Sequence, residues 1–240
     1  MTQYRDRREH LAVWKNDDEL FGLMRDKLFP AVIGDILDTM GRLRQFLPPR
    51  IRPVRDDMVV VGRAMPVLES NAFAAVEEQG KLPLSRQPFG LMFQALDDLK
   101  PHEVYVATGC APLFALWGGL MTTRARHLNA AGAVLDGYSR DTTEVLALGL
   151  PVFSYGGYAQ DQGARGKVVD YRIPVEIDGV RIRPGDILFG DRDGVLVIPR
   201  EAEEEAIRKG LEKAGTESAV RLAIERGMST VEAFERYGVM

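Results

Sequence analysis

The sequence has few of the residues on which disulfide-bonded or zinc-binding proteins depend. It contains one cysteine, Cys110, and three histidines among its 240 residues. A single cysteine cannot form an internal disulfide, which indicates the reducing environment of the cytoplasm. His10 and His102 fall in a charged tail and a turn, without Cys, Asp or Glu at zinc-ligand spacing. We therefore expect a cytoplasmic protein without a zinc site.

The chain also lacks a long apolar run and an excess of basic residues. Its first ten residues are rich in charge and have no apolar stretch of the kind that signal peptides need. No segment approaches the roughly 20 apolar residues of a membrane span. The net charge of −4 and the pI near 5.5 give no broad positive field for nucleic acid. We expect neither a membrane nor a nucleic acid as partner.

What the sequence does contain is an alternation of strand and helix patterns. Before residue 155, short buried apolar runs alternate with segments of helical period. After it, consecutive strand patterns follow, with a hairpin turn at Asp178-Gly179 and charged helices at the end. This order predicts one mixed α/β domain over 1–240, with a charged tail over 1–16 and C-terminal helices over 200–240.

Several segments have less regular patterns. Residues 69–87 show no clear period and are predicted to be a loop or flap. Residues 113–131 fit either one long helix or a helix that begins after the glycine pair 118–119. Alternation over 167–177 predicts one half-buried strand. Two separate charged helices are predicted over 201–213 and 217–226.

The segment 132–141, Gly-Ala-Val-Leu-Asp-Gly-Tyr-Ser-Arg-Asp, is the most informative part of the chain. Its apolar residues predict a short buried strand, which the pair Asp136-Gly137 ends with a turn. Asp141, followed three residues later by Glu144, predicts a helix start with Asp141 as the N-cap acceptor. The segment therefore joins the carboxyl end of a strand to the amino end of a helix, where α/β proteins bind anions.

The neighbouring residues Arg140 and Asp141 suit the binding of an organic acid with a metal ion. A guanidinium group can hold a carboxylate through two parallel hydrogen bonds, and a carboxylate is a hard oxygen ligand for a magnesium-type ion. The alternative is that the two residues are solvated or form a structural ion pair.

Four stretches in order, at characteristic spacing, carry a resemblance to a known family. The sequence resembles the RraA-like family, which includes metal-dependent aldolases for 4-hydroxy-4-methyl-2-oxoglutarate and 4-carboxy-4-hydroxy-2-oxoadipate, and a regulator of ribonuclease activity. The resemblance extends roughly from residue 17 to residue 227, and it favours a functional site at Arg140 and Asp141 over a surface ion pair. The four stretches are Ile33–Gly41, Trp117–Met121, Gly132–Asp141 and Pro184–Pro199.

The resemblance implies a fold, an activity and an assembly. The fold would be the three-layer β/β/α arrangement of the swivelling-domain type, assembled as a homotrimer or as a hexamer of two trimers. The activity would be that of a magnesium- or manganese-dependent lyase that releases pyruvate from a 4-hydroxy-2-oxo acid, with oxaloacetate decarboxylation as a side reaction. The alternative is a non-catalytic trimer that binds and regulates a partner such as a ribonuclease.

The resemblance also assigns site residues. Asp141 matches the direct metal ligand, and Arg140 matches the residue that binds the oxo-acid end of the substrate. Gly118, Gly119, Leu120 and Met121 match a turn whose backbone amides contact the substrate. Glu217 is the best match for a glutamate that reaches the metal-bound waters of a neighbouring subunit.

The chain departs from the family pattern within that turn. Aldolase members commonly carry an acidic residue where this sequence has Gly119. The carboxylate that would orient metal-bound water is therefore missing, so either another residue orients the water or the chemistry differs.

Overall fold

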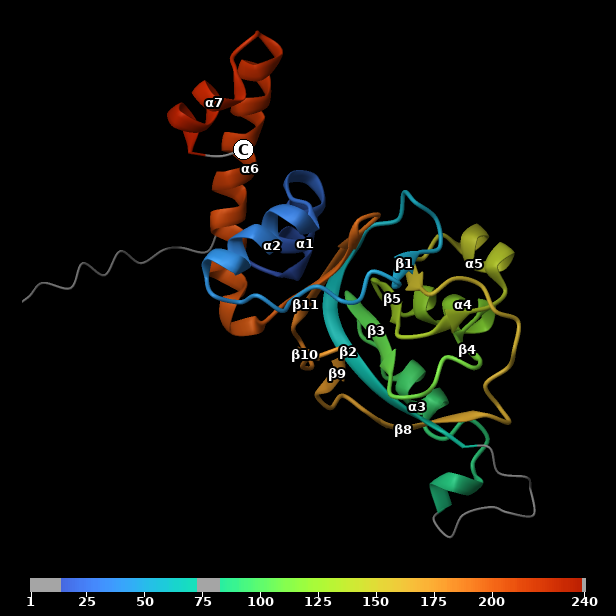
Figure 1. Cartoon of the computed structure of the whole chain (residues 1–240). Coiled ribbons are helices and arrows are strands. Elements are labelled where there is room, and N and C mark those ends of the chain that lie inside the picture. Colours follow the sequence, from blue (N-terminus) through green and yellow to red (C-terminus); the bar gives the residue numbers. More distant parts are fainter. Residues whose placement is uncertain (1–13, 73–82, 239–240) are drawn as a thin grey trace, which may run out of the picture.

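The computed structural model describes residues 14–72 and 83–238, and these form a mixed α/β fold (Figure 1). The larger helices are α1 (Asp17–Lys27), α2 (Pro30–Thr39), α3 (Met92–Asp97), α4 (Gly119–His127), α5 (Thr142–Leu148), α6 (Glu203–Glu225) and α7 (Thr230–Tyr237). The strands of the main sheet are β1 (Arg52–Pro53), β2 (Val60–Asn71), β3 (Glu103–Thr108), β5 (Gly132–Leu135), β7 (Val152–Ser154), β8 (Gly166–Tyr171), β11 (Ile187–Asp191) and β12 (Gly194–Ile198).

The parallel half of the main sheet carries the crossover helices that lead to the site. Strands β2, β3, β5 and β7 are parallel neighbours, and α3, α4 and α5 connect them in chain order. Figure 1 shows these three helices on one side of the sheet. Strand residues on that face, such as Tyr105, Ala133 and Leu135, are fully buried against the helices.

The sheet nearly closes on itself, because one connecting segment bridges its two edges. The Gln45 carbonyl accepts from the Val197 amide, and the Leu47 amide donates to the Val195 carbonyl, both at 2.8 Å, on edge strand β12. A few residues further on, β1 pairs antiparallel with β7 at the opposite edge. The short hairpin β9 (Val175–Ile177) and β10 (Val180–Ile182) adds a second β layer over the apolar interior of the curved sheet.

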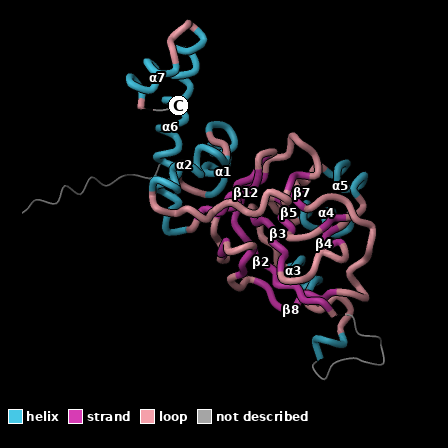
Figure 2. Tube along the Cα trace, in the orientation of Figure 1, coloured by secondary structure: helices cyan, strands magenta, loops and turns pink. Residues whose placement is uncertain are grey.

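The terminal helices cover the outer face of β11 and β12. Asn16 caps α1 by accepting the Glu19 amide at 3.0 Å, and Pro30 starts α2, where its missing amide is not needed. Helix α6 packs closely on α2 at Gly210, where any side chain would overlap Ile33. In Figures 1 and 2 the far half of α6 extends beyond the body and carries α7. No helix within 14–72 or 83–238 combines the length and apolar character that crossing a membrane requires.

The structure corrects several local predictions. The predicted break between 201–213 and 217–226 is wrong, because α6 is one continuous helix that includes Gly215. Nothing lies within 4 Å of the position that a Cβ at Gly215 would take, so no close contact requires a glycine there. The single strand predicted over 167–177 is wrong as well, since β8 ends at Tyr171 and β9 starts at Val175 in a different sheet.

Two further segments are resolved by the structure. Of the two alternatives for residues 113–131, the helix after a glycine turn is confirmed, with a short strand β4 (Ala115–Trp117) before it. The first part of the predicted loop over 69–87 is strand, because β2 continues to Asn71, and 83–86 form a 3-10 turn. Residues 73–82 of that segment, and residues 1–13 of the predicted tail, lie outside the described part of the chain.

Candidate functional site

A short parallel ladder brings the two predicted halves of the site together. Strand β4 pairs with β6 (Tyr138–Ser139) through Ala115 with Tyr138 and Trp117 with Ser139. The Arg140 amide continues the ladder by donating to the Trp117 carbonyl at 2.9 Å. Each strand runs directly into a helix start, so the turn before α4 and the residues before α5 lie side by side.

The glycine turn before α4 makes room for the Asp141 carboxylate. A side chain at Gly118 would place its Cβ 2.8 Å from Asp141 Oδ2 and 3.3 Å from Arg140 Cγ. The Gly119 amide donates a hydrogen bond to the same Oδ2 at 3.1 Å. The carboxylate therefore rests in a cradle that any other residue at position 118 would fill.

Asp141 does not cap its own helix, contrary to the sequence prediction. It occupies the N-cap position of α5, but its side chain accepts no hydrogen bond from the first turn of that helix. Its φ of 57° is in the left-handed region, which turns the side chain toward Gly119 instead. Such a conformation costs roughly 1 kcal/mol or more for a residue with a Cβ, although Asp tolerates it better than most. The backbone is thus held in an unfavourable conformation at the residue predicted to ligate metal.

Arg140 is fixed by an acid that the sequence did not indicate. Its Nη1 lies 2.8 Å from Asp161 Oδ1, whereas its Nε lies 3.8 Å from Asp141 Oδ2. The three side chains are each about 40% exposed, at 39%, 42% and 45% for Arg140, Asp161 and Asp141. Asp161 comes from the loop after β7, and no local pattern links it to residue 140. The guanidinium is oriented by this contact and keeps further N–H groups for a ligand.

These charged residues lie together in the wall of a cavity of about 280 Å³. Most of the predicted substrate-binding residues form part of its wall. Gly119 is in the turn but not in the wall, and its amide is directed at Asp141. The predicted residues that contribute to the wall are Gly118, Leu120, Met121, Arg140 and Asp141.

Glu144 occupies the space that a side chain at position 119 would take. A Cβ built on Gly119 would overlap the Glu144 carboxylate. Glu144 lies in the first turn of α5, three residues after Asp141, so both carboxylates are presented from one side of that helix. A carboxylate is therefore present beside the glycine turn, although it comes from a different element than the resemblance implies.

A buried carboxyl group, that of Glu69, contacts a residue of the cavity wall. Glu69 on β2 is 2% exposed, and its Oε2 accepts from Gln162 Nε2 at 2.6 Å, while Gln162 itself lines the cavity. Burial raises the pKa of Glu69 to about 8, which its bond with Gln162 only partly opposes. Within the described residues, the other Glu69 oxygen and the Tyr105 hydroxyl have no hydrogen-bond partner. Burial thus favours the neutral form of Glu69, and no local sequence pattern pointed to this group.

The donor set suits a hard divalent ion rather than zinc. Among residues 14–72 and 83–238, no group of three or more His, Cys, Asp or Glu side chains is close enough to share a metal. Magnesium commonly keeps several waters and binds to proteins through one or two carboxylates together with its substrate. The cradled Asp141, with Glu144 nearby, fits that mode of binding, whereas zinc would need three or four protein ligands.

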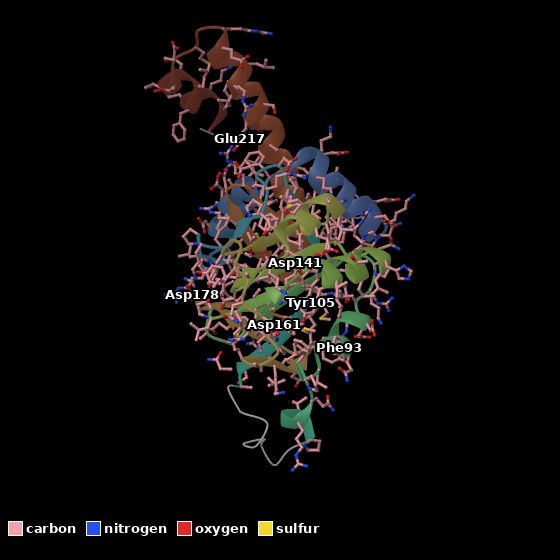
Figure 3. All side chains as sticks on the ribbon, turned by 90° about the vertical axis from the view of Figure 1, so that its right-hand side faces the viewer. Phe93, Tyr105, Asp141, Asp161, Asp178 and Glu217 are labelled. Carbon is pink, nitrogen blue, oxygen red and sulfur yellow. The ribbon has the colours of Figure 1, made fainter. Side chains whose placement is uncertain are left out.

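Glu217 lies apart from this site within a single chain. It is on α6, where its carboxylate is 3.5 Å from Lys213 Nζ. Figure 3 places Asp141, Asp161 and Phe93 in the body of the molecule and Glu217 well away from them, on α6, where it lines a groove with Asp26 and Lys27 of α1. A contribution of Glu217 across a subunit interface stays a prediction.

Comparison with known proteins assigns the chain to a family. The model of the RraA-like family, described as Aldolase/RraA, matches residues 31–197. A protein from Halalkalibacterium halodurans with the provisional name 4-hydroxy-4-methyl-2-oxoglutarate aldolase is 34% identical over 205 residues, which cover 84% of this chain and 87% of that protein. The chain belongs to the RraA-like family.

Two further relatives extend the comparison. Protein DlpA of Legionella pneumophila is 30% identical over 208 residues, or 86% of this chain, but the chain spans only about a third (32%) of DlpA. The crystal structure of RraAS2 from Streptomyces coelicolor, an unusual member of the RNase ES inhibitor RraA protein family, matches with a TM-score of 0.72 at 20% identity, over 87% of this chain and 98% of that one. This likeness confirms the predicted RraA-like α/β fold class.

Proposed function

We propose that this chain is a divalent-metal-dependent lyase that cleaves a 4-hydroxy-2-oxo acid to pyruvate and a second carbonyl compound. The observation that carries the proposal is the pairing of a cradled, strained Asp141 with an oriented Arg140 in the wall of a cavity. The provisional aldolase name of the relative from H. halodurans, most of whose length this chain covers, supports the same activity.

The proposed reaction breaks the bond between C3 and C4 of the substrate. The 4-hydroxyl group loses its proton and becomes the carbonyl group of the second product. The electron pair of the broken bond passes to C3 and the 2-oxo group, and C3 then takes up a proton to give pyruvate. Bound magnesium or manganese would stabilise the negative charge that develops on the 2-oxo oxygen.

Each charged residue has a separate proposed role in this reaction. Asp141 holds the ion, and the Gly119 amide keeps the carboxylate in place. Arg140 binds the substrate carboxylate with the N–H groups that Asp161 leaves open, and adds positive charge beside the reacting carbonyl. Glu144 orients water beside the glycine turn, in the space left by the missing side chain at position 119.

The test uses the full chain after treatment with a chelator. Adding magnesium or manganese should restore pyruvate release from a panel of 4-hydroxy-2-oxo acids and from oxaloacetate. Asp141→Ala should abolish the activity, and Arg140→Ala should lower it by roughly two to four orders of magnitude, as expected for the loss of one charge-stabilising group. Arg124→Ala, on α4 and paired with Asp97 outside the cavity wall, is the matched control. Absence of metal-dependent pyruvate from every compound would contradict the proposal.

A regulatory binding protein is the second candidate function. The family of RraAS2 is described by its inhibition of an RNase, and Gly119 lacks the acid that aldolase members commonly carry. A ligand that binds only the folded chain must stabilise it, and the stabilisation grows with the ratio of the ligand concentration to its dissociation constant. Thermal unfolding with magnesium and oxalate therefore separates the two candidates. A rise in melting temperature that is lost in Asp141→Ala favours the lyase, and no rise favours the binding protein.

A homotrimer, or a hexamer of two trimers, is the proposed assembly. One carboxylate from the chain leaves most positions around a six-coordinate ion to water and substrate, so a neighbouring subunit would help to enclose them. The far half of α6 extends beyond the body (Figure 3), and in this proposal it reaches a neighbour and brings Glu217 to that neighbour's site. Light scattering tests the assembly, and an active monomer would disprove it. An unchanged manganese affinity in Glu217→Gln would remove Glu217 from the site.

A further inference from the structure

The cavity beside Arg140 and Asp141 has two chemically different ends. Its charged side chains are Arg140, Asp141 and Asp161, and both acids lie within ion-pair distance of Arg140. These three define the charged end, and the remaining wall is called the apolar end. The rest of the wall is mainly apolar, and its large side chains include Phe89, Met92, Phe93, Leu96, Leu116 and Met121.

The apolar end presents aromatic and aliphatic surface that the fold itself does not cover. Phe93 is 55% exposed and Leu120 is 83% exposed at the cavity, although both are large apolar side chains. The rings of Phe89 and Phe93 meet edge to face, with their centroids 5.7 Å apart. Such a pair offers a ligand one ring face and one ring edge.

The backbone at Phe89 is strained, which singles out this part of the wall. Its φ of 60° is in the left-handed region, where a bulky residue is a genuine outlier. Ladder hydrogen bonds on both sides hold it there: the Val168 amide donates to the Phe89 carbonyl at 3.1 Å, and the Leu91 amide donates to the Val168 carbonyl at 2.9 Å. Strain of this kind persists where the surrounding structure over-determines it, and it clusters at ligand sites.

The charges in the wall limit what the apolar end can accept. Arg140 is the one cationic side chain among the described residues that line the cavity, and it faces two acids, Asp141 and Asp161. The carboxylate at the 2-oxo end of the substrate would accept hydrogen bonds from the remaining N–H groups of Arg140. A second carboxylate, carried on C4, would lie against apolar side chains without a positive partner among the described wall residues, and it would lose part of its hydration there.

We infer that the substrates of this site are 4-hydroxy-2-oxo acids whose fourth carbon carries an apolar alkyl or aryl group instead of a second carboxylate. The inference rests on the proposed lyase function. A cavity of about 280 Å³ is at the small end of ligand pockets, which suits one ring or a few carbons beside the oxo-acid end. The bond changes are those of the proposed cleavage, with an aldehyde or a ketone as the second product.

The first experiment compares two substrates on the full chain with manganese. One is 4-hydroxy-2-oxo-4-phenylbutanoate, and the other is 4-hydroxy-4-methyl-2-oxoglutarate. We expect kcat/KM, measured as pyruvate released, to be at least about tenfold higher for the phenyl compound. A preference of that size is within the range of discrimination that a hydrophobic pocket provides. Equal or higher kcat/KM for the dicarboxylate would overturn the inference while leaving the lyase function intact.

A second experiment measures binding without cleavage. The compounds 2-oxo-4-phenylbutanoate and 2-oxoglutarate lack the 4-hydroxyl group, so neither can be cleaved by this route. The phenyl compound should raise the melting temperature more at equal concentration. If it does so while no substrate is cleaved, the lyase proposal fails and the apolar specificity stands. If 2-oxoglutarate stabilises the chain more, the inference is overturned whatever the activity.

A charge placed at the apolar end should reverse the preference. Phe93→Lys puts a cation on an already exposed position, and it should shift the ratio of the two kcat/KM values toward the dicarboxylate by about tenfold. Leu43→Lys is the matched control, because Leu43 is 73% exposed in the segment after α2 and does not line the cavity. An unchanged ratio in Phe93→Lys, measured on protein that melts like the wild type, would count against the inference.

Discussion

Replacing Glu69 by Gln should change the way in which stability depends on pH. Glu69 is buried behind the cavity, with a pKa raised to about 8 by burial. Gln has nearly the same shape, cannot ionise, and keeps an oxygen that can accept from Gln162. The substitution therefore removes the titration of this group and retains its contact with the cavity wall.

The sign of the effect follows from the two pKa values of Glu69, about 8 in the folded chain and 4.5 as the ordinary value. Between these values the folded state keeps the proton and the unfolded state loses it, so this group lowers the free energy of unfolding as pH rises. A difference of 3.5 pKa units corresponds to about 5 kcal/mol, since each unit is worth about 1.4 kcal/mol. The destabilisation is absent below about pH 4.5 and complete above about pH 8.

Urea unfolding of wild type and Glu69→Gln at pH 5, 6.5 and 8 measures this effect. The free energy of unfolding of the variant, minus that of the wild type, should increase by several kcal/mol across the series. Glu176→Gln, at an exposed position of β9, is the control for replacing a carboxylate by an amide outside the core. A difference for Glu69→Gln that stays within about 1 kcal/mol from pH 5 to pH 8 would refute the conclusion that the fold holds this acid neutral.

Three further predictions concern the metal, the packing of glycine positions and the partly buried ion pairs of Arg63. Asp141→Asn, which tolerates the left-handed backbone, should lower manganese affinity at least tenfold in calorimetric titration while moving the urea midpoint little. Gly62→Ala should destabilise the fold by roughly 1–3 kcal/mol, because its Cβ would overlap the His102 carbonyl, whereas Gly215→Ala in α6 has open surroundings and should stabilise by up to about 1 kcal/mol. Arg63→Met should lower the free energy of unfolding in urea by roughly 1–3 kcal/mol, because Arg63 is a partly buried cation that pairs with Asp17 of α1 and Glu203 of α6. An unchanged urea midpoint would show that these ion pairs contribute nothing to stability.

The sequence predicted those parts of the fold and site that depend on local patterns. Apolar runs located strands such as β3 and β5, and the pair Asp178-Gly179 marked the hairpin of β9 and β10. Family resemblance brought Arg140 and Asp141 into one site, and the structure places both at the same cavity.

The contacts that the sequence did not predict are long-range or depend on backbone conformation. Asp161 meets Arg140 across 21 positions, and Gln162 meets Glu69 across 93, so neither pair leaves a local signal. The cap predicted for Asp141 failed because a positive φ cannot be inferred from residue type. The break predicted in α6 failed because one glycine does not end a long helix that packs along α2.

The ladder of β4 and β6 positions the charged residues of the site independently of most of the apolar wall that would contact the substrate's substituent. Main-chain hydrogen bonds fix the positions of residues 118 and 140, whatever side chains surround them. The apolar wall comes largely from other segments, the residues before and within α3 and the first turn of α4. Mutations could therefore remodel the wall for a new substituent without moving Arg140 or Asp141, which makes this framework a starting point for engineering altered substrate preference.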